Sequence, residues 1–350
     1  MALQPSGQIK YSEIIAEFGT PNNGGIGEYR LSENVGSLTN LPLDTGVPQG
    51  NSQIKFSDFY SKRLNHVVDL YSIGNGSSRQ NAKDRWNNGN VHIVGSTKTG
   101  KTQPPDTVED RVIINVNATI SSVKGTQTHC ALRTGNWDTN TTLEIEIGTS
   151  GKLYGSGGDG GSGGSANETA GTNGQTGSSA LGIQYPCTVN NLGVIQSGYG
   201  GGGGGGGNTR TTGGGKKSGA VTNGSSGGGG GGGAGSPAGA GGGVQTPLAV
   251  GGGSAGSAGA AGSLSNLVTG AGTGGAGGSE AGTGGNASAV NNSATKADDG
   301  GTYVVDGNQQ SADGGIGGNN GYAIITNQAS APSVTGNSAT GRIITSTNPT

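Results

Sequence analysis

The sequence GSTKTGKT at residues 95–102 is the most enzyme-like motif in the chain, because it matches the phosphate-binding pattern G-x-x-x-x-G-K-[S/T]. In such loops, backbone N–H groups at the start of a helix hold the phosphates of a nucleotide. Here Pro104 and Pro105 follow directly, and proline removes both the donors and the α conformation that this helix needs. We therefore expect a surface β-hairpin loop at this position and no nucleotide cofactor.

Other residues that could do chemistry lack the context that chemistry requires. Two G-x-S-x-G strings, at 160–164 and 252–256, match the pattern of serine hydrolases, but no strand-to-helix turn surrounds them and a chain rich in Gly and Ser produces them by chance. The histidines His66, His92 and His129 are scattered without metal-ligand spacing. We expect no catalytic residue, no metal and no cofactor, and so a protein that is not an enzyme.

The two cysteines, Cys130 and Cys187, form neither a disulfide framework nor a zinc-binding set. We expect free buried thiols, while the possibility that they pair stays open.

The composition explains why a pocket enzyme is not expected in most of the chain. Of 80 glycines in 350 residues, 64 lie in residues 151–350, a region without Trp or Phe that cannot bury an ordinary apolar core. Collagen is excluded because the glycines keep no G-X-Y period. The net charge of -2 gives no electrostatic footprint for nucleic acid. Neither a signal peptide nor an 18-residue apolar segment is present, so we expect synthesis in the cytoplasm of the producing cell.

Residues 1–63 contain an internal repeat, QIKYSE at 8–13 and QIKFSD at 53–58. Each copy has an extended apolar/polar alternation followed by a serine and an acidic residue, so we expect Ser12 and Ser57 to N-cap two short helices. Such helices are marginal alone, so they must fold against each other or against a partner. Both an accessory module and a docking element remain open at this point.

Residues 64–150 read as an ordinary β domain. We expect strands within 91–94, 111–120, 129–133 and 142–147, because β-branched and alternating runs are separated by Gly, Asn and Asp turns, and no helical period of useful length appears. Trp86 and Trp137 mark this region as the one with a side-chain core. The last part, 301–350, regains β-type runs at 302–305, 322–326 and 342–345.

Residues 151–300 repeat a different pattern, in which a strand and an apolar pair lead into a glycine run: 143–164 resembles 187–207. Glycine loses much backbone entropy on folding, so such runs are either flexible linkers or polyglycine II helices, whose N–H and C=O groups bond neighbouring helices. The runs 200–207 and 227–233 would span roughly 25 and 22 Å. The expected fold class is mainly β and irregular: short N-terminal helices, a β domain, then a polyglycine II bundle.

Two resemblances add to this interpretation. PSGQIKYSEIIAEFG, GIGEYR and IKFSDFY resemble the N-terminal segment of tail-associated structural proteins of tailed phages. The glycine-rich stretches 153–164, 193–207 and 227–233 resemble the receptor-recognising adhesins at the tips of T-even phage long tail fibres, which stack polyglycine II helices and carry variable loops at the distal end.

These resemblances imply a virion protein with two kinds of site. Recognition of a host surface glycan or outer-membrane protein falls to the polar loops 208–212, 216–226 and 263–269, with the candidate residues Arg210, Lys216, Lys217, Asn223 and Asn266. Contact with other tail or fibre proteins falls to the N-terminal repeat, with the candidate residues Ile9, Tyr11, Phe18, Ile54, Phe56, Phe59 and Tyr60. The alternatives are an ice-binding polyglycine II protein and a flexible glycine-rich matrix protein.

Overall fold

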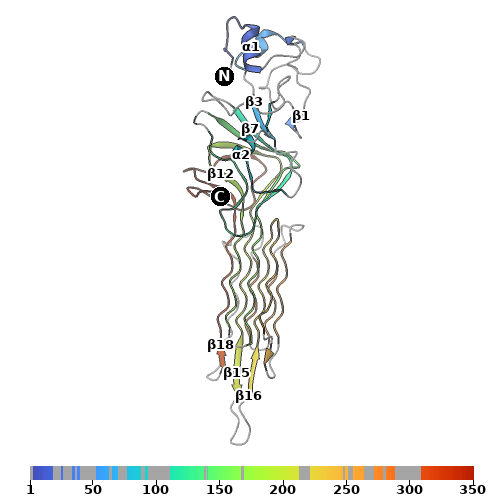
Figure 1. Ribbon diagram of the computed structural model, residues 1–350, viewed down its shortest axis with the longest axis vertical. Helices are drawn as coiled ribbons and strands as arrows, with labels where there is room; N and C mark the ends of the chain where they lie inside the picture. Colours follow the sequence, from blue (N-terminus) through green and yellow to red (C-terminus); the bar gives the residue numbers. More distant parts are fainter. Residues whose placement is uncertain are drawn as a thin grey trace, which may run out of the picture.

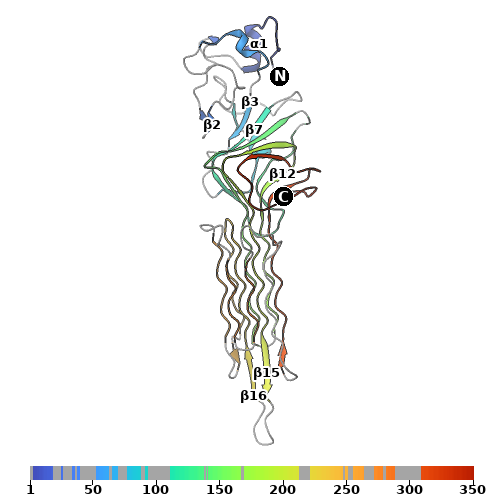
Figure 2. The same ribbon diagram turned by 180° about the vertical axis from the view of Figure 1, so that it is seen from behind.

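The computed structural model describes residues 3–18, 25–26, 34–35, 38–39, 53–62, 65–69, 77–87, 91–93, 111–137, 139, 141–166, 169–212, 221–246, 249–250, 255–263, 272–278, 281–287 and 309–350. The protein is mainly β. It is elongated, with α1 (Tyr11–Phe18) at one end, a group of sheets in the middle, and a long bundle of glycine-rich segments leading to the other end (Figures 1 and 2). No described helix is long and apolar enough to cross a membrane.

Three parallel sheets form the middle of the molecule. The first contains β3 (Asn65–Asp69), β7 (Arg111–Val116), β10 (Thr142–Ile147), β13 (Cys187–Asn191) and β20 (Ser333–Gly336), with β6 (Val91–Ile93) antiparallel at its edge. The second contains β4 (Ser77–Ser78), β8 (Thr119–Ser121), β11 (Lys152–Tyr154) and β14 (Val194–Gln196). The third contains β5 (Gln80–Asn81), β9 (Cys130–Arg133), β12 (Ser179–Ile183), β19 (Tyr322–Thr326) and β21 (Arg342–Ile344). A separate antiparallel pair joins β1 (Asn34–Val35) and β2 (Leu38–Thr39).

The chain visits the three sheets in the same order in each turn, which is the path of a parallel β-solenoid. One turn runs through β10, β11 and β12, and the next through β13, β14 and β19. Each sheet sends a ladder of buried aliphatic side chains inward: Ile114, Ile145 and Val189; Ile120, Leu153 and Ile195; Leu132, Leu181 and Ile324. Stacking of like residues in register gives this part of the chain the apolar core that its β-branched runs predict.

The predicted strands that lie within the described residues are confirmed, with two differences, and the predicted run 302–305 lies outside those residues. The run 111–120 is two strands, because the chain turns a corner of the solenoid at Asn117 and Ala118 and enters the next sheet. The region also contains a six-residue helix that the sequence does not indicate, α2 (Ala82–Asn87), which places Trp86 against Trp137 with ring centroids 5.7 Å apart and an interplanar angle of 72°. A helix this short leaves no periodic signal in the sequence.

The sequence repeat that precedes the glycine runs corresponds to two successive solenoid turns. β10 pairs with β13 from Leu143↔Cys187 onward, and β11 pairs with β14 from Lys152↔Val194 onward. In both turns the chain leaves the solenoid at the same corner, as residues 155–178 between β11 and β12 and as residues 197–321 between β14 and β19. The preceding turn closes this corner with residues 122–129. Strands on both sides of residue 150 therefore belong to the same sheets.

The glycine-rich segments are joined by backbone hydrogen bonds that repeat every three residues. The N–H groups of Gly227, Gly230 and Gly233 donate to carbonyls of segment 155–166, at 2.7–2.8 Å. The N–H groups of Gly228 and Gly231 donate to segment 281–287. Those of Gly229 and Gly232 donate to segment 255–263. Three successive residues thus point their N–H groups at three different neighbours, and no donor in the run 227–233 is left without a partner.

Segment 224–235 is enclosed on all sides. Backbone hydrogen bonds connect it to six neighbouring segments: 155–166, 197–208, 237–246, 255–263, 272–278 and 281–287. A Cβ atom on Gly230 would lie 2.0 Å from the carbonyl oxygen of Gly202, so this position admits only glycine. The peripheral segments 272–278 and 281–287 instead carry exposed side chains at every third residue, Thr273 and Ala276 on one, Thr283 and Asn286 on the other. The glycine pattern of the sequence therefore follows the number of neighbours that each segment has.

The N-terminal repeat folds upon itself. The rings of Tyr11 and Phe56 meet edge to face with centroids 6.2 Å apart, the N–H of Leu3 donates to the carbonyl of Lys62 at 2.8 Å, and the hydroxyl of Tyr60 donates to the carbonyl of Gly7. The first copy forms α1, and the second forms only one 3₁₀ turn, η2 (Phe56–Phe59).

The prediction that Ser12 and Ser57 are N-caps is wrong. The caps are Lys10 and Lys55, whose backbone N–H groups donate to the carboxylates of Glu13 at 2.8 Å and Asp58 at 2.6 Å. The acidic residue three positions on satisfies the first free N–H, so the serine is left inside the first turn.

Candidate functional site

The end of the molecule farthest from α1 is a small antiparallel sheet. β15 (Asn208–Thr212) continues the glycine run 200–207, β16 (Val221–Ser225) leads into the run 227–233, and the two strands pair as a hairpin. β18 (Gln309–Ser311) pairs with β15, and β17 (Ala249–Val250) pairs with β16. In both views β15 and β16 extend beyond the glycine-rich bundle (Figures 1 and 2).

Asn208 marks the change from glycine segments to a sheet. It is the first residue with a side chain after the run 200–207, it is buried, and its Oδ1 accepts the N–H of Ser225 at 3.1 Å. Because the two antiparallel central segments are already aligned by the bundle, Thr- and Val-rich continuations pair as strands. The bundle therefore fixes the position at which the hairpin begins.

The structure brings together some of the residues predicted to bind a receptor. Arg210 lies in β15, opposite Asn223 in β16 and Gln309 in β18. The side chain of Arg210 and the whole of Lys216, Lys217 and Asn266 lie outside the described residues. The prediction of loops at 208–212 and within 216–226 is wrong where β15 and β16 form, because strand pairing continues past the glycine runs.

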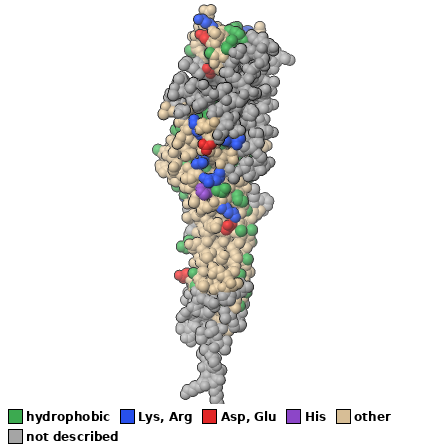
Figure 3. Space-filling model, in the orientation of Figure 1, with side chains coloured by type: hydrophobic (Ala, Val, Ile, Leu, Met, Phe, Trp, Pro, Cys, Tyr) green, Lys and Arg blue, Asp and Glu red, His purple; other side chains and the backbone are tan. Residues whose placement is uncertain are grey.

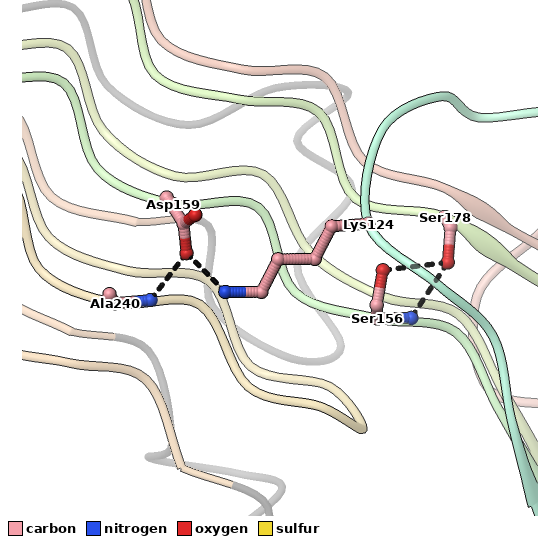
Figure 4. Close-up of polar contacts among 5 residues, drawn as sticks. All are labelled: Lys124, Ser156, Asp159, Ser178 and Ala240. Atoms are coloured by element: carbon pink, nitrogen blue, oxygen red, sulfur yellow. Dashed lines mark hydrogen bonds and ion pairs between the residues drawn. The ribbon is translucent and has the colours of Figure 1, made fainter. Parts of the chain in front are cut away.

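One ion pair connects the bundle to the solenoid, and further polar contacts join the glycine segments to one another where they begin (Figure 4). Lys124, in the corner loop 122–129, forms an ion pair with Asp159, and the same carboxylate oxygen accepts the N–H of Ala240 at 2.6 Å. Ser156 and Ser178, both buried, are joined by hydroxyl and backbone hydrogen bonds of 3.0 and 2.7 Å. Both partners of the ion pair are about one-third exposed, so the pair contributes about 1 kcal/mol at most to stability.

The N-terminal candidates separate into buried and exposed residues. Ile9, Ile54 and Phe59 are buried, whereas Phe56 is 42% exposed. Tyr11 and Tyr60 are partly buried, and the side chain of Phe18, at the end of α1, lies outside the described residues. Figure 3 shows hydrophobic and charged side chains together at this end of the molecule. The buried residues hold the module together, so the exposed aromatic surface is what a partner could contact.

The two thiols are free, as expected, although Cys187 is only partly buried. Burial raises the pKa of each thiol to about 12, and for Cys130 the opposing effects of Arg133 and Arg79 are smaller. Both cysteines are therefore neutral near pH 7 and poor nucleophiles.

The other candidate chemical residues form no site in the part of the chain that the structure describes. Within that part, no three His, Cys, Asp or Glu residues are placed to hold a metal ion. Residues 160–164 form an extended glycine segment rather than a strand-to-helix turn, and residues 95–102 lie outside the described residues. His66 and His92 belong to the paired strands β3 and β6, and His129 precedes β9.

Comparison with known proteins gives little. No family model matches the sequence, and no curated protein matches it significantly. A solved structure that aligns with the chain is the gp37-gp38 adhesin tip complex of the bacteriophage S16 long tail fibre, at 18% identity, with 98% of this chain and 100% of that chain covered. The TM-score is 0.39, which is too low to establish a shared fold.

Proposed function

We propose that the chain is a non-catalytic attachment protein of a tailed-phage virion, in which a polyglycine II bundle carries a receptor-binding hairpin. The observation that carries the proposal is the enclosure of segment 224–235 by six neighbours through backbone hydrogen bonds at three-residue intervals. Such a bundle needs no apolar interior, and its described surface carries few charges (Figure 3). It is suited to hold a hairpin at a distance from the solenoid.

In this proposal the two ends of the molecule have different partners. The N-terminal module contacts other tail or fibre proteins through Tyr11, Phe56 and Tyr60, while Ile9, Ile54 and Phe59 form its core. At the far end, Arg210 and Asn223 on the hairpin bind a host surface glycan or outer-membrane protein, together with the remaining candidates Lys216, Lys217 and Asn266. Several copies per particle would raise a weak single contact to stable attachment.

Binding of the full chain to whole bacterial cells tests the proposal. The fluorescently labelled protein is titrated onto a panel of candidate host strains, and Lys216→Ser with Lys217→Ser and Asn223→Ala is compared with the parent chain. We expect at least a tenfold loss of cell binding, because charge and hydrogen bonds at the hairpin are removed. The matched control, Lys10→Ser with Lys55→Ser, removes two charges at the other end and should bind as the parent does. Equal binding by both variants on every strain that binds the parent would refute the hairpin as the receptor site.

Ice binding is a second candidate, favoured by the exposed rows of Thr273 and Ala276 beside Thr283 and Asn286. The rows are adjacent, since the N–H of Gly284 donates to the carbonyl of Gly275 at 2.9 Å, and a regular face of small side chains is the kind of surface that can order water. Thermal hysteresis of the parent chain that disappears in Thr273→Tyr with Thr283→Tyr would favour this candidate. Its absence, with cell binding intact, would favour the adhesin. The third alternative, a flexible matrix protein, fits poorly with glycine segments that are hydrogen-bonded along their length.

A further inference from the structure

A cavity of about 320 Å³ lies at one corner of the solenoid, away from both ends of the molecule. Its walls come from two successive turns: Ile183, Pro186 and Cys187 at the corner from β12 to β13, and Thr326 with residues 328–333 at the corner from β19 to β20. The strands before and after these loops are paired, so both loops turn the same corner. The first needs three residues (184–186) and the second has six (327–332), so the longer loop stands away from the shorter one.

The longer loop is held in place by Gln328. Its N–H donates to Oγ1 of Thr326 at 3.0 Å, its Nε2 donates to the carbonyl of Gln184 at 3.2 Å, and its carbonyl accepts the N–H of Ser346 at 3.0 Å. Pro186 and Pro332 restrict the backbone at the two sides of the cavity. A cavity with walls fixed in this way loses little conformational entropy when a ligand enters.

The lining defines which chemistry the cavity can accept. It contains no charged side chain, and the apolar surface comes from Ile183, the two prolines and two alanines. Ala329, Ser330, Ala331 and Ser333 line the cavity and are exposed, and among the described residues the backbone N–H groups of the first three donate to no protein acceptor, so these groups and the two serine hydroxyls are accessible to a ligand. The thiol of Cys187 is neutral because burial raises its pKa to about 12, so it contributes no charge. Uncharged walls with free N–H donors favour a neutral ligand rich in oxygen acceptors.

We propose that this cavity is a carbohydrate subsite that takes one neutral, hexose-sized sugar residue through hydroxyl contacts with the loop 327–332. It goes beyond the proposed function because it lies on the solenoid and needs nothing from the hairpin. A sugar of this size that uses hydrogen bonds without an aromatic platform should bind with a dissociation constant in the range of about 1–10 mM. A site this weak would hold a glycan firmly only where several copies of the chain bind it together.

Cys187 provides a native reporter, because it lines the cavity, while Cys130 is fully buried and serves as an internal reference. The full chain is treated with methyl methanethiosulfonate at pH 8.5, and modification of each cysteine is followed by peptide mass spectrometry. We expect Cys187 to react about tenfold faster than Cys130, since exposure governs access to the thiol. Glucose, galactose and N-acetylglucosamine are then added separately at 50 mM, with glucuronic acid as the charged comparison. At least one neutral sugar should slow Cys187 severalfold, and glucuronic acid should not.

A variant and its control assign the effect to the cavity. Ala331→Trp fills it and should abolish both the protection and the saturation-transfer NMR signal of the bound sugar, whereas Ala170→Trp, on an exposed glycine-rich segment, should leave both unchanged. Three results would overturn the proposal: equal modification rates of the two cysteines, no protection by any neutral sugar, or protection that persists in Ala331→Trp. The first two come from the unaltered chain and do not depend on the variant folding. Loss of cell binding in the hairpin variant bears on the proposed function alone.

Discussion

At the scale of single residues, the bundle depends on which glycines have a neighbour where a side chain would stand. A Cβ on Gly230 would lie 2.0 Å from the carbonyl oxygen and 2.5 Å from the carbonyl carbon of Gly202, both backbone atoms that cannot move alone. A Cβ on Gly243, in the outer segment 237–246, would meet nothing within 4 Å. The two positions share the residue type and differ only in surroundings.

We therefore expect Gly230→Ala to lower the free energy of unfolding by about 3 kcal/mol or more, as overpacking against a rigid core does. Gly243→Ala should be neutral or stabilise the protein by up to about 1 kcal/mol, because alanine has less backbone freedom in the unfolded chain. Urea unfolding followed by circular dichroism measures both. Equal losses in the two variants would mean that local glycine flexibility, rather than close packing of segments, is what the bundle requires.

Cys130 gives a pH dependence of known sign. Burial raises the pKa of its thiol from 9.0 to about 12, so the unfolded chain loses this proton at lower pH than the folded one. The stabilisation is complete below pH 9 and is lost as the pH rises from 9 to 12, by about 1.4 kcal/mol per unit from this group. Cys130→Ala should be less stable at pH 8 but should lose stability less steeply between pH 9 and 11. Parallel slopes for parent and variant, measured by denaturant unfolding, would show that the thiol is not protected from water.

At the scale of elements, the central and peripheral glycine segments should differ in amide exchange. In the run 227–233 every N–H donates to a neighbouring segment. In segment 272–278 the N–H groups of Gly272, Gly275 and Gly278 donate to the central segment, and that of Gly274 donates to Oδ1 of Asn286. The N–H groups of Thr273, Ala276 and Gly277 have no such partner in the described part of the chain.

Amide exchange resolved by NMR should thus be slow at all seven positions of 227–233. In segment 272–278 it should be slow where the N–H donates and fast at Thr273, Ala276 and Gly277. The same measurement separates the bundle from a flexible chain, in which both segments would exchange fast throughout. Slow exchange at Thr273 and Ala276 would instead indicate that a further layer covers this side of the bundle.

The elements also show what could be predicted from the sequence. Local patterns predict the strands, the two-turn repeat ahead of the glycine runs and the tryptophan core, because each depends only on residue types and their spacing. The solenoid path does not, since it depends on pairing between strands such as β12 and β19 that are separated by most of the glycine-rich insertion. The caps at Lys10 and Lys55 were also missed, because the acidic residue rather than the serine accepts the backbone N–H. The strands β15 and β16 do not follow from the local sequence, because nothing local reveals that the bundle aligns them.

At the scale of the whole molecule, the bundle consists of two insertions into the solenoid, and the ends of each insertion are joined by a backbone hydrogen bond. The ends of the first glycine insertion meet where the N–H of Ser178 donates to the carbonyl of Ser156 at 2.9 Å. The ends of the second meet where the N–H of Gly321 donates to the carbonyl of Gly198 at 2.8 Å. Each insertion therefore leaves and re-enters the solenoid at adjacent points, which is the arrangement in which an inserted module can be removed without breaking the host fold.

We expect a chain that lacks residues 157–177 and 199–320, with Asn-Gly turns joining the cut ends, to fold as the solenoid with its N-terminal module. It should keep a β-type circular dichroism spectrum and a single cooperative thermal transition, because the three buried ladders are intact. The midpoint of its thermal transition should be lower than that of the full chain. The side chains of Tyr154 and Gln196 are buried in the full chain, and removing the glycine segments that follow them would expose them. Under the proposed function, the shortened chain should also not bind to host cells, since it lacks the hairpin. A non-cooperative transition would mean instead that bundle and solenoid fold only together. Contacts such as that of Lys124 with Asp159 would then lie within one cooperative folding unit, and would not join two separate folding units.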